Sequence, residues 1–92
     1  MKVIVVGAGK VGYYLVKTLL EHGHTPVVIE TDLTHCRQAA DELGIPVTCG
    51  DGSSADTLRA AGAEGADAIV TATGADQTNL IACQTARRVF GV

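Results

Sequence analysis

The 92-residue chain is poor in aromatic residues and carries no excess of positive charge. Its aromatic side chains are Tyr13, Tyr14 and Phe90, and seven Lys and Arg residues stand against ten Asp and Glu, for a net charge of -3. Proteins that bind polynucleotides use a basic face or an aromatic surface on which bases stack. Because the chain has neither, we expect no nucleic acid partner.

The sequence also lacks a long apolar run. The longest uninterrupted aliphatic stretch is Val3 to Val6, whereas a helix that crosses a bilayer needs about 20 apolar residues. The stretch is also shorter than the apolar core of a signal peptide. We therefore expect a cytoplasmic chain without direct membrane insertion.

Cysteine is scarce and unpaired in the sequence. Cys36, Cys49 and Cys83 are an odd number of residues, widely spaced, with no CxxC pair. A disulfide framework or a zinc site favours even counts or closely spaced pairs. We expect no metal site and predict that the three thiols are small buried hydrophobic groups in a reducing compartment. No Ser-His-Asp or Cys-His arrangement suggests nucleophilic catalysis, so no catalytic residue is expected.

What the chain does contain is an alternation of two hydrophobic periodicities. Its length allows one domain, residues 1–92, and its 47% hydrophobic content is enough for a packed core. Strand patterns are predicted at 2–6, 26–30, 45–49 and 67–72, and helical patterns at 10–21, 33–43, 53–61 and 75–90. Such alternation predicts an α/β fold with helices on both faces, a Rossmann-like doubly wound parallel sheet of four βα units in the order 3-2-1-4.

Two local patterns give finer expectations. In the first helix, Val11, Leu15, Thr18 and Leu19 fall on one stripe, which predicts the buried face. Before the third helix, Ser53 is followed three residues later by Asp56, which predicts a capping box.

A full dinucleotide-binding sheet continues with two more strands beside the fourth. Here the chain ends after the fourth helical pattern, at Gly91 and Val92. An uncovered apolar edge strand is an aggregation liability. The interpretation is a domain truncated before strands five and six, or one that obtains those strands from another chain.

A GxGxxG motif, Gly7-x-Gly9-x-x-Gly12, joins the first strand to the first helix. Gly7 permits the turn, Gly9 lets a diphosphate approach the backbone, and Gly12 allows close packing of helix on sheet. The free amides at the helix start favour phosphate oxygens. The backbone from 7 to 12 is therefore the predicted phosphate cradle.

Glu30 ends the second strand 18 residues after Gly12. A carboxylate there accepts hydrogen bonds from both ribose hydroxyls and repels a 2′-phosphate, which favours NAD or adenosine nucleotides over NADP. The alternative is a solvated strand end. Asp32 is the second candidate for this role, although helix capping suits it better. Lys10 either reaches a terminal phosphate or is simply exposed on the first helical turn.

Polar and small residues follow the other two strands at the same sheet edge. Asp51 and its neighbours are predicted to meet the adenine side, or else to form an ordinary turn, and residues 71–73 lie at the topological switch point where such sheets hold ligands. The expected cofactor-binding residues are Gly7, Ala8, Gly9, Lys10, Val11, Gly12, Glu30, Thr31, Asp51, Gly52, Ser53, Thr71, Ala72 and Thr73.

These motifs resemble the N-terminal nucleotide-binding domain of bacterial and archaeal potassium-uptake regulators of the Trk/Ktr type. The resemblance rests on KVIVVGAGKVG, VVIE-x-D, the GDGS turn, LRAAGAEGADAIVTAT, and Asp76-Gln-Thr-Asn79 with Cys83-Gln84. It implies a regulatory domain that binds NAD(H) or ATP/ADP and controls a membrane potassium transporter or channel through homo-oligomers, as dimers or rings of dimers, at the inner face of the membrane. The alternative function is the cofactor-binding fragment of an NAD-dependent oxidoreductase.

Overall fold

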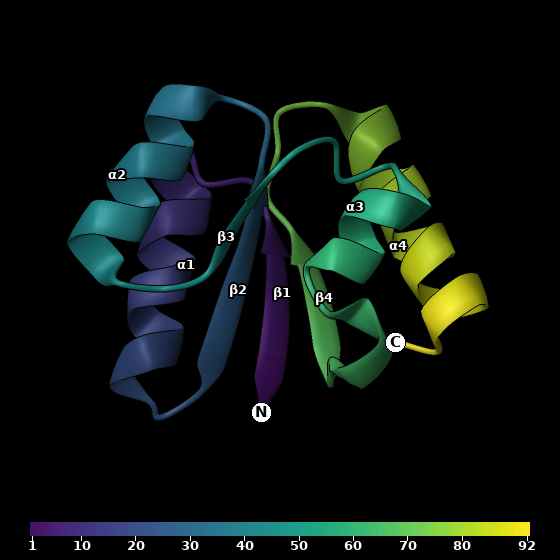
Figure 1. The fold of residues 1–92 in the computed structure, drawn as a ribbon, viewed down its shortest axis with the longest axis horizontal. Coiled ribbons are helices and arrows are strands. Elements are labelled where there is room, and N and C mark those ends of the chain that lie inside the picture. Colours follow the sequence, from purple (N-terminus) through teal and green to yellow (C-terminus); the bar gives the residue numbers. More distant parts are fainter.

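The fold is a four-stranded parallel sheet covered by helices on both faces (Figure 1). A computed structural model describes all residues from Met1 to Val92. The elements in chain order are β1 (Lys2–Val6), α1 (Lys10–Glu21), β2 (Thr25–Glu30), α2 (Leu33–Leu43), β3 (Val47–Cys49), α3 (Ala55–Ala60), the 3₁₀ turn η1 (Ala63–Gly65), β4 (Ala68–Thr71) and α4 (Asp76–Phe90). The strand order β3-β2-β1-β4 confirms the predicted Rossmann-like sheet.

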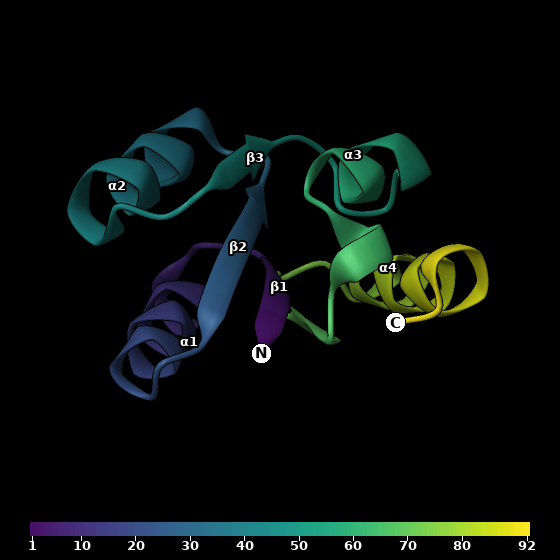
Figure 2. The same ribbon diagram turned by 60° about the horizontal axis from the view of Figure 1, so that its bottom comes forward.

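Helices α1 and α2 cover one face of the sheet, and α3, η1 and α4 cover the other (Figure 2). Strand β1 pairs with β2 and β4 along its two edges, and helices cover both of its faces, which explains its continuous aliphatic sequence. Because successive side chains of a strand point to opposite faces, Val3 and Val5 join the core under α1 and α2. Ile4 and Val6 join the core under α3 and α4.

The parallel register brings all four strand ends to one edge of the sheet. Val6 at the end of β1 pairs with Ile29 of β2 and with Thr71 of β4. Glu30 at the end of β2 pairs with Cys49 of β3. The segments that follow the four strands therefore meet at this edge.

The buried face of α1 agrees with the predicted stripe at Leu15 and Leu19, which pack against the core, but not at Val11. Val11 and Tyr14 are exposed, at 71% and 73%, whereas Gly12 and Val16 are buried. The cause is the close approach at Gly12, where a Cβ atom would lie 1.9 Å from the Gly7 carbonyl oxygen. The contact with Gly7 sets the orientation of the helix, so Val16, one turn later, enters the core.

The predicted capping box at Ser53 is wrong. Helix α3 has its N-cap at Ser54, whose side chain accepts from the Thr57 N–H. Ser53 is held outside the helix because its N–H and hydroxyl both donate to Asp51. Asp56 instead pairs with Arg59, at 3.1 Å.

The predicted strands 45–49 and 67–72 are longer than the observed β3 and β4. Pro46, which has no N–H to donate, directly precedes β3. The expectation for cysteine is correct only for Cys36, since Cys49 and Cys83 are exposed. Cys49 ends β3, which is an edge strand of the sheet, and Cys83 lies on the outer face of α4. One side of each of these elements has no neighbour.

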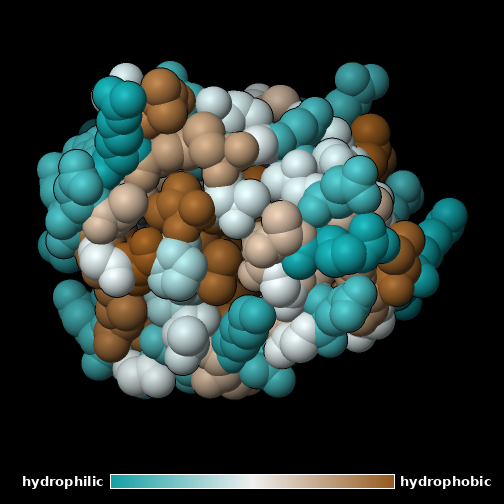
Figure 3. Space-filling model, in the orientation of Figure 1, coloured by the Kyte–Doolittle hydropathy of each residue, from teal (hydrophilic) through white to brown (hydrophobic).

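Hydrophobic and hydrophilic side chains separate on the face drawn in Figure 3. Hydrophobic side chains gather left of the middle of this face, with smaller groups at its right-hand margin, and hydrophilic ones cover much of the rest. Large apolar side chains are also exposed on α4, at Leu80, Ile81 and Val89. No helix has the length and apolar character that crossing a membrane requires.

Candidate functional site

A cleft of about 460 Å³ lies at the edge where the strands end. This volume falls within the usual range for small-molecule sites. Eight of the residues expected to bind a cofactor line it: Gly7, Gly9, Glu30, Thr31, Asp51, Gly52, Ala72 and Thr73. Residues from all four strand ends thus come together, as the parallel topology requires.

Gly7 makes the turn between β1 and α1. Its φ of +107° lies in the region that favours glycine, and a Cβ atom there would be 2.7 Å from the Ala72 carbonyl oxygen. The Gly7 N–H donates to the Ile29 carbonyl at 2.7 Å. The loop is therefore fixed between β2 and the end of β4.

Gly9 is different, because nothing in the chain itself requires a glycine there. Its φ is −71°, and a Cβ atom would meet no atom within 4 Å. Gly9 is also one of the residues that line the cleft. A missing side chain at this position leaves room for a group that approaches the backbone from outside the chain.

The N-terminus of α1 is available to an anion. No side chain caps it, and its first turn holds no acidic residue. By contrast, Asp32 caps α2 by accepting from the His35 N–H at 3.0 Å, and Ser54 caps α3. The unpaired amides and positive dipole end of α1 therefore favour a negatively charged group beside Gly9.

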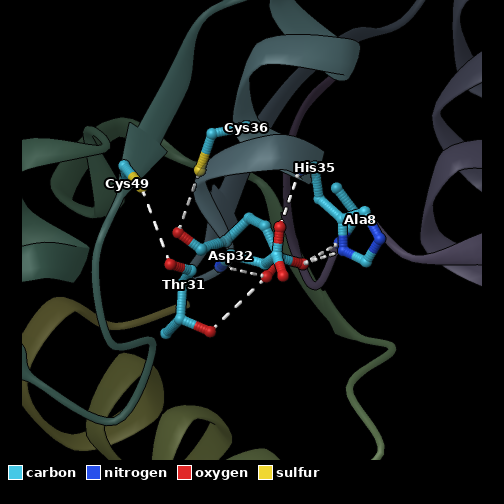
Figure 4. A network of polar contacts seen from close by, with 7 residues as sticks. Ala8, Thr31, Asp32, His35, Cys36 and Cys49 are labelled. Atoms are coloured by element: carbon cyan, nitrogen blue, oxygen red, sulfur yellow. Dashed lines mark hydrogen bonds and ion pairs between the residues drawn. The ribbon is translucent and has the colours of Figure 1, made fainter.

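Glu30 connects the glycine loop to the start of α2 through hydrogen bonds with Ala8 and Asp32, both labelled in Figure 4. One carboxylate oxygen accepts from the Ala8 N–H and the other from the Asp32 N–H, each at 2.7 Å. The side chain is 11% exposed, and the Nδ1 atom of His35 lies 3.9 Å from it. A carboxylate oxygen is able to accept two hydrogen bonds. The Glu30 carboxylate therefore keeps acceptor capacity for a group in the cleft.

The turn after β3 forms a third wall of the cleft. Hydrogen bonds from the N–H and hydroxyl of Ser53 hold the pKa of Asp51 below its ordinary value, so the carboxylate stays charged. At Gly52 a Cβ atom would lie 2.4 Å from a methyl carbon of Val6. This close approach brings the turn against the end of β1.

The rim after β4 is held by Asn79 of α4. The Asn79 amide donates to the Thr73 carbonyl at 3.0 Å, and the Thr73 hydroxyl donates to the Asn79 side-chain oxygen. This pairing fixes the residues between β4 and α4, several of which line the cleft. Sequence reasoning singled out Asn79 only as part of a resemblance and assigned it no role.

The residues that line the cleft differ in part from those predicted from the sequence. The cleft also contains residues that the prediction missed or assigned elsewhere: Val6, Ile29, Asp32, His35, Gly50, Gly74, Ala75 and Thr78. His35 lies three residues after the Asp32 cap, and this spacing was the available signal for it. The predicted residues that do not line the cleft are Ala8, Lys10, Val11, Gly12, Ser53 and Thr71. Lys10 and Val11 instead line a shallow hollow on α1 with Tyr14.

The TrkA-N domain family matches residues 3–92, which is nearly the whole chain. The chain belongs to the TrkA-N domain family. Among curated relatives, it is 42% identical over 90% of its length to a Trk system potassium uptake protein TrkA homolog of Methanothermobacter thermautotrophicus. It is 39% identical over its full length to the Trk system potassium uptake protein TrkA of Streptomyces coelicolor.

A solved TrkA-N domain has the same fold. The TrkA-N domain of the inner membrane protein ybaL from Escherichia coli is 26% identical, with a TM-score of 0.84, over 94% of this chain and 63% of that one. The chain covers only 38% and 41% of the two curated relatives. The TrkA-N match therefore describes one part of those longer proteins.

Proposed function

We propose that this TrkA-N domain binds an adenine nucleotide, either NAD(H) or ATP/ADP, in the cleft at the strand ends. The observation that carries the proposal is the unfilled space at Gly9 beside the uncapped N-terminus of α1, with the Glu30 carboxylate close by. Phosphate groups favour such a helix start, and ribose hydroxyls favour a carboxylate at the end of the second strand.

The charge distribution of the cleft supports one orientation of the ligand. Carboxylates of Glu30, Asp32 and Asp51 lie on the side formed by β2, α2 and β3. Phosphates are repelled from that side and attracted to the start of α1. The ribose hydroxyls would then be held by Glu30, and the adenine side would lie toward Asp51 and Gly52. Ala72 and Thr73 would line the opposite wall.

The same charges set the preference between nucleotides. A 2′-phosphate at the ribose would meet the Glu30 carboxylate, whose oxygens already accept two backbone hydrogen bonds in the ionised form. Repulsion between these anions disfavours NADPH. We therefore propose NAD(H) or ATP/ADP, and not NADP(H), as the ligand.

We further propose that the nucleotide regulates a membrane potassium transporter or channel. The names of the two curated relatives, both potassium uptake proteins, support this class of partner over the cofactor part of an oxidoreductase. Regulation requires that a ligand bind one arrangement of the assembly better than another. The domain would act as a homo-oligomer on the cytoplasmic side of the membrane, without a catalytic residue of its own.

Calorimetric titration with NADH, NAD, ATP, ADP and NADPH tests the ligand. We expect NADH to bind at least about tenfold more tightly than NADPH, a difference of about 1.4 kcal/mol. Glu30→Gln should reduce the difference in affinity between NADH and NADPH, because it removes the negative charge beside the ribose. Asp41→Asn, which removes an exposed charge from α2 outside the cleft, should leave it unchanged. Equal affinity for NADH and NADPH in the unmodified chain would contradict the role of Glu30.

A further inference from the structure

Two thiols lie directly behind the Glu30 segment. Cys36 of α2 donates to the Glu30 carbonyl oxygen at 3.2 Å, and Cys49 at the end of β3 donates to the Thr31 carbonyl oxygen at 3.8 Å. Figure 4 shows both sulfur atoms against the same stretch of backbone, one carried by α2 and the other by β3. The two sulfurs thus contact consecutive carbonyl groups.

Figure 4 draws the two thiols close together, on the same side of the Glu30 segment. Burial, followed by the influence of the Cys49 thiol and of the nearby carboxylates, raises the pKa of Cys36 to about 12. Their backbones are close for a topological reason, since Cys49 pairs with Glu30 in the sheet and α2 begins three residues after Glu30. The accessibility of the two differs: Cys49 is exposed and Cys36 is buried. An oxidant therefore reaches Cys49 first.

We propose that Cys36 and Cys49 form a redox-active thiol pair that a hydroperoxide converts into a disulfide. The Cys49 thiolate attacks one peroxide oxygen, the O–O bond breaks, and the other oxygen leaves with a proton, as an alcohol or, from hydrogen peroxide, as water, while Cys49 becomes a sulfenic acid. The Cys36 sulfur then attacks the Cys49 sulfur, and the sulfenic hydroxyl leaves with the Cys36 proton as water. The two sulfurs lose two electrons, and the peroxide gains them.

Disulfide formation changes the segment that carries Glu30. The disulfide has no S–H groups, so the carbonyls of Glu30 and Thr31 lose both thiol donors. The sulfurs must also approach to about 2.05 Å, which draws the end of β3 toward the first turn of α2 across the Glu30 segment. We infer that nucleotide affinity falls about fivefold, the effect of losing two weak hydrogen bonds. This second step rests on the proposed nucleotide site, whereas disulfide formation does not.

Mass spectrometry tests the thiol pair in the full chain. After treatment with hydrogen peroxide and alkylation of the remaining thiols, we expect a peptide that links Cys36 to Cys49, with Cys83 alkylated. Cys83→Ser should give the same link, because Cys83 lies apart on α4. Cys49→Ser, a change at an exposed position, should leave Cys36 alkylated after unfolding. A link through Cys83, a disulfide between two chains, or an unlinked Cys36 would overturn the proposal.

Calorimetry on the reduced and oxidised Cys83→Ser protein tests the effect on binding. We expect NADH to bind about fivefold more weakly to the oxidised form, and reduction with a dithiol should restore the affinity. Equal affinity of the two forms would overturn the coupling between the thiols and Glu30. If neither form binds any adenine nucleotide, the proposed function fails, while the mapped disulfide still supports the thiol pair.

Discussion

Gly9 and Gly12 belong to one motif but are glycines for different physical reasons. At Gly12 a side chain would collide with the Gly7 backbone, so the fold itself requires glycine. At Gly9 the chain leaves the space open, so the requirement comes from outside the chain. The motif spacing predicted both positions, but only the structure separates the residue needed for folding from the residue proposed for binding.

This difference predicts the effect of Gly9→Ala. The Gly9 backbone angles suit alanine, and no atom of the chain obstructs the new methyl group, so the thermal unfolding midpoint should hardly change. The methyl group would occupy the approach to the backbone amides and should cost about 1–3 kcal/mol in NADH affinity, as overpacking does. Calorimetry provides the affinity.

Gly65→Ala is the matched control. Gly65 also has open space at its Cβ position but lies in η1, outside the cleft. NADH affinity should be unchanged in this variant. An equal loss of affinity in both variants, or none in Gly9→Ala, would contradict the phosphate cradle.

The raised pKa of Cys36 leads us to expect a loss of folding stability at alkaline pH. Its pKa rises from 9.0 to about 12 in the folded chain, mainly through burial. Because the folded state holds the proton more tightly than the unfolded state, this contribution is fully present below pH 9.0. It is lost as the pH rises toward and through about 12. Urea unfolding under reducing conditions should therefore show a steeper alkaline loss of unfolding free energy in the unmodified chain than in Cys36→Ser. Parallel pH profiles for the two would contradict the burial effect.

At the scale of elements, helix ends explain which amides remain available to a ligand. Asp32 and Ser54 satisfy the first turns of α2 and α3, and α1 is left without a side-chain cap. The sequence predicted Asp32 correctly as a cap, since it directly precedes the apolar pattern of α2. It misplaced the α3 cap by one residue because Ser53 and Ser54 are adjacent, and the contact between Ser53 and Asp51 decides between them.

The two adjacent serines allow a direct comparison. Ser54→Ala removes the acceptor for the Thr57 N–H and should lower the free energy of unfolding by about 1 kcal/mol. Ser53→Ala removes an exposed hydrogen bond to Asp51 and should cost less. Chemical denaturation of both variants measures the difference. A larger loss for Ser53→Ala would mean that the helix begins where the capping box predicted.

At the scale of the whole molecule, the strand order and the position of the cleft are the features that the sequence predicted. Alternating strand and helix patterns predict a parallel sheet, and the handedness of the crossovers leaves few strand orders. The order 3-2-1-4 was predicted as the usual one of dinucleotide-binding sheets, and the structure confirms it. The cleft position followed too, because parallel strands end at one edge. Side-chain hydrogen bonds, such as those of Asn79 with Thr73 and of Cys36 with the Glu30 carbonyl, depend on side-chain placement that periodicity does not encode.

The most direct test of the account is amide chemical-shift mapping of the ¹⁵N-labelled chain with NADH. We propose that the diphosphate lies against the amides that begin α1, and that Glu30 holds the ribose. We expect the largest shift changes at Gly9, Lys10 and Val11, with further changes at Ala8 and Asp32, whose amides donate to Glu30. Shift changes that spare the segment 8–11 and gather at another surface, or no shift changes at saturating NADH, would contradict it.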